Sequence, residues 1–125
     1  MTSLIGITGL LFSFLFNILI VIIFFLKNKK FTNKLFYYLI YFSFIFIFIS
    51  FASLILTYVF SDFSNFNVFQ NSHSTKPLFY KITGTWGNHE GSMLMWLLIM
   101  SLYNLFFSFD KKLDKDLKKL TIVFQ

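Results

Sequence analysis

The chain has 125 residues, of which 57% are hydrophobic and 13% are charged, and its formal net charge is +6. One small aqueous core cannot bury this much apolar surface, so the composition excludes a soluble globular domain and predicts an all-α integral membrane protein. The absence of cysteine excludes a disulfide, a thiolate metal ligand and a thiol nucleophile.

Two apolar stretches, residues 4–26 and 35–60, contain no charge and exceed the roughly 20 residues that cross a bilayer as a helix. Small and polar residues recur at steps of three and four in the first stretch, which predicts a face for close helix packing: Gly6, Gly9, Ser13 and Asn17. Large apolar residues such as Phe46 are expected to face lipid. No cleavage-site pattern follows the first stretch, so a removable signal peptide is not expected.

The second half of the chain is more polar. Residues 61–85 are rich in Asn and Ser and lack a helical period, which predicts a structured loop. The third apolar stretch is long enough to span a membrane if its helix begins near Trp86, so a helix is expected over 86–109. Residues 110–125 form a basic tail, either a surface helix or the lead-in to another span. Residues 1–125 are thus one membrane domain with three transmembrane helices.

Lysines are concentrated in two places. Four lie within residues 27–34 and five within residues 111–119. The positive-inside rule places both groups on the inner side of the membrane and loop 61–85 on the outer side. The charge therefore reports membrane topology, and nucleic acid is not an expected partner. The abundant Phe, Ile, Leu, Lys, Asn and Tyr have AT-rich codons, which suggests an organelle gene as a hypothesis.

The stretch GTWGNHEGSMLMW, residues 84–96, carries the candidate site. Read as a helix, it places four side chains on one face, where they could line a flat ligand such as haem: Trp86, His89, Met93 and Trp96. The same spacing is typical of helix packing. His89 is either a single axial ligand or a hydrogen-bonded structural histidine, and Glu90 is expected to anchor the helix start. No spacing indicates a catalytic residue or a metal ligand set.

Residues 71–96, NSHSTKPLFYKITGTWGNHEGSMLMW, resemble the N-terminal part of CcmF, the large haem lyase subunit of cytochrome c maturation. The family pattern is carried by Trp86, Gly87, His89, Glu90, Gly91 and Ser92. The resemblance implies a multi-span membrane protein that promotes covalent attachment of haem to apocytochrome c on the outer face. The tryptophan-rich haem loop of that family lies downstream of the matched segment and is not in this chain. We therefore expect an N-terminal subunit or fragment, as in a split or shortened mitochondrial version, that scaffolds the haem site.

The resemblance also implies a setting and partners. The expected location is the mitochondrial inner membrane with loop 61–85 facing the intermembrane space, and the alternative is a bacterial inner membrane. Haem is expected in the assembled complex and not on the isolated chain. The expected partners are the bilayer, the haem lyase subunits that carry the haem loop and, indirectly, apocytochrome c and a haem carrier. The alternative function is a structural membrane subunit of a respiratory-chain assembly without lyase activity, with respiratory-complex subunits as partners.

Overall fold

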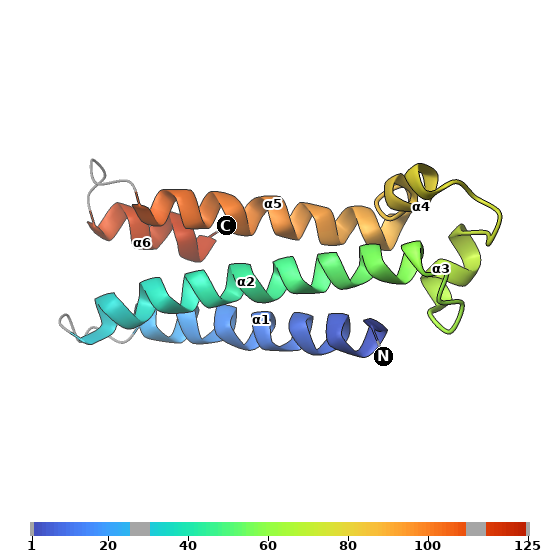
Figure 1. Cartoon of the computed structure of the whole chain (residues 1–125). Helices are drawn as coiled ribbons and strands as arrows, with labels where there is room; N and C mark the ends of the chain where they lie inside the picture. Colours follow the sequence, from blue (N-terminus) through green and yellow to red (C-terminus); the bar gives the residue numbers. More distant parts are fainter. Residues whose placement is uncertain (1, 26–30, 110–114, 125) are drawn as a thin grey trace.

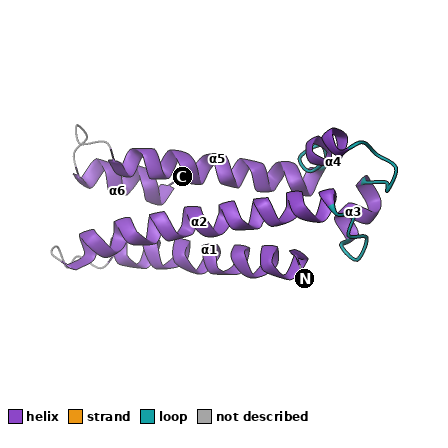
Figure 2. Cartoon of the chain, in the orientation of Figure 1, coloured by secondary structure: helices purple, strands orange, loops and turns teal. Residues whose placement is uncertain are grey.

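The computed structural model describes residues 2–25, 31–109 and 115–124, and within these ranges it contains helices and short connections but no strand (Figure 2). Three helices are long and apolar enough to cross a membrane: α1 (Thr2–Phe25), α2 (Phe31–Val59) and α5 (His89–Phe109). They lie side by side with α2 between the other two, and α2 runs antiparallel to both (Figure 1). The predicted all-α class with three candidate spans is confirmed.

The connections contain shorter helices. Between α2 and α5 lie α3 (Phe66–Asn71) and α4 (Leu78–Gly84), so the segment expected as a structured loop is partly helical. Asn65 begins α3, because its side chain accepts a hydrogen bond from the Asn67 amide at 3.0 Å. Helix α6 (Lys115–Phe124) turns back beside α5, and its Ile122 is buried against α1 and α2 residues. The apolar end of the basic tail therefore packs into the bundle.

Helix α5 begins at His89, three residues later than the sequence reading placed it. The chain forms a turn over residues 85–88, after α4 ends at Gly84. Trp86 therefore lies in this turn and outside α5, so the helical spacing from Trp86 to His89 does not apply. The start is set by Asn88, whose carbonyl accepts the first helical hydrogen bond, from the Ser92 amide at 3.0 Å.

Helices α1 and α2 pack through the small residues that the sequence singled out. The Ser50 hydroxyl donates to the Gly6 carbonyl at 2.8 Å, and a Cβ added at Gly9 would lie 3.1 Å from the Phe46 carbonyl. The Asn17 amide donates to the Ser43 hydroxyl at 2.9 Å. Such close approach strengthens helix association in lipid. The predicted packing face is thus confirmed.

The expectation that Phe46 faces lipid was wrong. Its ring centroid lies 5.4 Å from that of Phe12 and 5.6 Å from that of Phe16, both on α1. Phe48, two residues later, is 53% exposed. The physical reason is helical geometry, since two residues turn the side chain by about 200° to the other side of the helix.

The bundle has two distinct ends (Figure 1). The first, which we call the basic end, contains the end of α1, the start of α2, the end of α5, and α6. The second, which we call the cap, contains α3, α4 and the turn at residues 85–88. Lys34 lies at the basic end, whereas residues 26–30 and 110–114, with five of the lysines used for the topology prediction, lie outside the described residues. The orientation of these ends across a membrane stays a prediction.

Candidate functional site

The motif run from residue 84 to residue 96 lies in the cap, and its polar residues first serve to build the start of α5. The Asn88 side-chain oxygen accepts a hydrogen bond from the Gly91 amide at 2.7 Å. Asparagine is a favoured residue at this position because its side chain satisfies an amide that the helix leaves without a partner. Asn88 is therefore the N-cap of α5, a role that the sequence reading did not assign.

Tyr58, near the end of α2, is the centre of a polar cluster. Its side chain is fully buried, and its hydroxyl accepts a hydrogen bond from the Asn88 side-chain amide at 2.6 Å. The same hydroxyl donates to the side-chain oxygen of Asn67 on α3. A buried hydroxyl with both partners fixes the elements that supply them. We call Tyr58, Asn67 and Asn88 the cap hub, which joins α2, α3 and the start of α5.

Glu90 extends the cap hub at its exposed edge. Its carboxylate accepts a hydrogen bond from the Asn67 side-chain amide at 3.4 Å. Glu90 also lies in the first turn of α5, where a negative charge complements the positive end of the helix dipole. This position agrees with the expected role at the helix start, and the contact to α3 is an addition that only the fold reveals.

Gly91 lies where α5 approaches the preceding turn most closely. A Cβ added there would lie 1.6 Å from the Thr85 carbonyl oxygen and 2.8 Å from its carbonyl carbon. Thr85 itself is fully buried, so it has little room to move away. By contrast, a Cβ at Gly87 would be 3.6 Å from the nearest atom, an ordinary contact. Of these two motif glycines, Gly91 is the one whose lack of a side chain the packing requires.

The cap is also tied to α1. The Asn65 side-chain amide donates to the Ser3 hydroxyl at 3.1 Å. Asp62 accepts hydrogen bonds from the Ser64 hydroxyl at 2.6 Å and the Ser64 amide at 3.2 Å. These bonds favour the ionised carboxylate and lower the pKa of Asp62 from its ordinary value. All three long helices therefore meet the same polar cap.

The four residues predicted to line haem are not enclosed by the part of the chain that the structure describes. His89, Met93 and Trp96 are exposed on α5, with Met93 57% and Trp96 61% exposed, and Trp86 is half-buried in the turn before them. The buried positions of α5 are Gly91, Leu94 and Ser101, on the side toward the bundle. His89, Met93 and Trp96 thus form an outward ridge that could contact one side of a planar ligand, and the described residues give that ligand no opposite wall.

Comparison with known proteins identifies relatives of the chain. It is 54% identical over 77 residues to "Cytochrome c-type biogenesis protein CycK" of Rhizobium meliloti, a match covering 61% of this chain and 11% of that protein. It is 42% identical over 52 residues to "Cytochrome c-type biogenesis protein CcmF" of Escherichia coli, covering 42% of this chain and 8% of that protein. A "Probable cytochrome c biosynthesis protein" of Daucus carota is 42% identical over 57 residues, a match that covers 46% of this chain and 9% of that protein.

The chain is a homologue of cytochrome c-type biogenesis proteins. This confirms the resemblance to that class of protein that the sequence indicated. The matches span about a tenth of the length of these cytochrome c biogenesis proteins, at 11% and 8% for CycK and CcmF. No family model and no solved structure matches the chain.

Only some of the site residues predicted from the sequence lie at the polar cluster of the cap. The motif glycine and glutamate, Gly91 and Glu90, lie together with the cap hub, whereas the aromatic and thioether side chains point away from it. The sequence reading missed all three residues of the cap hub. Asn88 could have been found from the cap preference of asparagine directly before an apolar helix. Tyr58 and Asn67 carry no such local signal.

Proposed function

We propose that the chain takes part in cytochrome c maturation, as a part of a membrane haem lyase that promotes covalent attachment of haem to apocytochrome c. The observation that carries this proposal is the 54% identity over 77 residues with a cytochrome c-type biogenesis protein. The cap supports it further, because the motif residues Glu90 and Gly91 are used to fix the start of α5. We assign no catalytic residue to the chain.

The role that fits this geometry is a scaffold for a haem site formed with other chains. The cap hub holds the start of α5 rigidly, so His89, Met93 and Trp96 keep fixed positions on the outward ridge. Large exposed apolar side chains held on a rigid element are suited to packing against a partner. Haem, the substrate of the reaction, would meet this ridge on one side while the partner chains with the tryptophan-rich haem loop supply the rest.

The proposed location is the mitochondrial inner membrane, with the cap in the intermembrane space and the basic end in the matrix. The lysine distribution supports the orientation through the positive-inside rule. The AT-rich codon character of the composition supports an organelle source. In a bacterial inner membrane, the same orientation would place the cap outside the cytoplasm.

Purification of the native complex through a tag on this chain tests the proposal. We expect subunits that carry the tryptophan-rich haem loop to co-purify with it. Asn88→Ala, which removes the α5 cap, should reduce the yield of the complex, whereas Lys76→Gln on the exposed edge of the cap should not. Recovery of respiratory enzyme subunits in place of haem lyase subunits would reject the proposal in favour of a structural respiratory subunit.

A further inference from the structure

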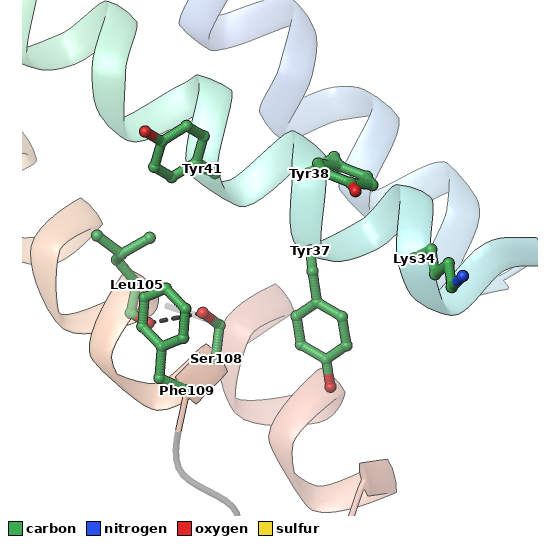
Figure 3. Close-up of a pocket in the computed structure, with 7 residues that line it drawn as sticks. All are labelled: Lys34, Tyr37, Tyr38, Tyr41, Leu105, Ser108 and Phe109. Carbon is green, nitrogen blue, oxygen red and sulfur yellow. Dashed lines mark hydrogen bonds between the residues drawn. The ribbon is translucent and has the colours of Figure 1, made fainter.

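A groove at the basic end lies between α2 and α5, far along the bundle from the cap. Its volume is about 560 Å³, within the range of pockets that hold small ligands. Its lining comes from two helices, with Lys34, Tyr37, Tyr38 and Tyr41 on α2 and Leu105, Ser108 and Phe109 on α5 (Figure 3). The groove therefore combines one cation and three phenols with a mainly apolar wall.

The groove lies where two candidate membrane spans meet charged residues, so we expect it at the depth where a membrane changes from polar to apolar. In the sequence, the uncharged apolar stretch of α2 begins directly after Lys34, and that of α5 ends at Phe109, directly before Asp110. Lys34, Tyr38 and Tyr41 are at steps of four and three, so they follow one face of α2 inward. At 1.5 Å per residue, Tyr41 lies about 10 Å deeper than Lys34. The groove is thus cationic at the level of headgroups and aromatic and aliphatic at the level of acyl chains.

Along the sequence, the net charge of the chain is concentrated in the segments next to the helix ends that form the basic end. Residues 27–34 contain four lysines and no acidic residue, and residues 110–119 contain five lysines and three aspartates. At the cap, Lys76 and Lys81 are balanced by Asp62 and Glu90. The net charge of +6 therefore comes from the segments that adjoin the basic end. Basic clusters beside transmembrane helices attract anionic lipid headgroups, whereas zwitterionic lipids gain little there.

The polar groups of the groove favour an anionic lipid headgroup over an apolar helix as its occupant. Among the described residues, no hydrogen bond joins the Lys34 ammonium or the tyrosine hydroxyls of the groove to a protein acceptor, and Lys34, Tyr38 and Tyr41 are exposed. An apolar helix packed over the groove would remove these donors from water without supplying acceptors, which costs free energy. A phosphodiester supplies several acceptor oxygens and a negative charge, and it forms short charge-assisted hydrogen bonds with an ammonium.

We propose that this groove binds one anionic phospholipid. The phosphate accepts hydrogen bonds from Lys34 and from tyrosine hydroxyls at the mouth of the groove. The upper parts of the acyl chains lie against Tyr41, Leu105 and Phe109. The bound lipid fills the space between α2 and α5 at the basic end, and so links these two helices where the cap does not reach. This site is independent of the proposed role in cytochrome c maturation.

Native mass spectrometry of the purified full chain in detergent tests the site, with phosphatidylglycerol and phosphatidylcholine of the same acyl chains as probes. We expect one phosphatidylglycerol to be retained in preference to phosphatidylcholine. Lys34→Gln should weaken phosphatidylglycerol binding about fivefold, as expected for the loss of one lysine near the headgroup. Lys76→Gln removes the same charge at the cap and should leave binding unchanged. Phe109→Ala, at a side chain that is 68% exposed, should weaken lipid retention without unfolding the chain.

Three results would overturn the proposal. Equal retention of the two lipids, or equal weakening by Lys34→Gln and Lys76→Gln, would mean that the groove has no anionic headgroup site. A photo-crosslinking amino acid in place of Tyr38 distinguishes a bound phospholipid from a bound protein helix in native membranes. We expect adducts with phospholipid. Adducts only with protein would show that another helix covers the groove, and the lipid proposal would then be wrong.

Discussion

Replacing Gly91 with alanine gives the sharpest test of the cap. An alanine in the first turn of an ordinary helix is more stable than glycine by about 0.5–1 kcal/mol. Here the added Cβ would lie 1.6 Å from the Thr85 carbonyl oxygen and must move to at least 3.0 Å. The obstacle is backbone, so no side-chain rotation relieves it. The required shift would also disturb the bond between the Gly91 amide and Asn88. Overpacking of this kind costs about 1–3 kcal/mol or more.

The expected change in unfolding free energy therefore distinguishes Gly91→Ala from its matched control, Gly87→Ala. A Cβ at Gly87 makes only ordinary contacts, the nearest at 3.6 Å, and Gly87 does not have a positive φ. Both variants can be compared by far-ultraviolet circular dichroism of the chain in mixed micelles during titration with a denaturing detergent. Gly91→Ala should lose about 1–3 kcal/mol of unfolding free energy, and Gly87→Ala should stay close to the parent chain. Equal stability of the two variants would refute the close packing of α5 on the turn at residues 85–88.

Further predictions concern the cap hub, the lipid face, the topology and haem. Asn88→Ala should cost about 1–3 kcal/mol in the same titration, because it removes the α5 cap and one partner of the Tyr58 hydroxyl; an unchanged midpoint would contradict the hub. Phe46→Ala should cost roughly 2 kcal/mol at a half-buried site, whereas Phe48→Ala should be nearly neutral; the reverse order would mean that the lipid face is assigned wrongly. Cysteines at Lys34 and His73 should react with an impermeant reagent from opposite sides of the membrane, and labelling of both from one side would reject the topology. The isolated chain should retain no stoichiometric haem; a stable haem absorption spectrum that is lost in His89→Ala would contradict this.

The long helices could be predicted from the sequence because lipid imposes a simple rule on composition. An uncharged apolar run of this length has few alternatives to a membrane-spanning helix, and the small residues of α1 mark its packing face in advance. Composition does not predict, however, which apolar side chains of a span face lipid and which face another helix. Phe46 and Phe48 are the same amino acid, two positions apart in the sequence. Only the rotation of α2 against α1 determines that Phe46 packs on Phe12 and Phe16.

The cap was harder to predict because its contacts join residues far apart in the chain. Tyr58 meets Asn88 across 30 positions, and Asn67 meets Glu90 across 23. Neither pair has a periodic signal, and an isolated tyrosine near a helix end is typical of an interfacial aromatic belt. The interpretation of Trp86 as part of the helix failed for a local reason, since a favourable cap at Asn88 sets the start of α5 after it. The ridge formed by His89, Met93 and Trp96 follows from α5 alone, so that part of the face could be predicted.

Haem staining of c-type cytochromes tests the proposed role of this chain in cytochrome c maturation most directly. The measurement compares membranes from cells depleted of this chain with membranes in which it is supplied again, while the assembly of respiratory complexes is followed in the same samples. We expect loss of haem-stained cytochrome c on depletion and its recovery with the parent chain and with Lys76→Gln, but weaker recovery with Gly91→Ala. Normal haem-stained cytochrome c in depleted membranes, accompanied by loss of a respiratory complex, would contradict a role in cytochrome c maturation and support a structural respiratory subunit.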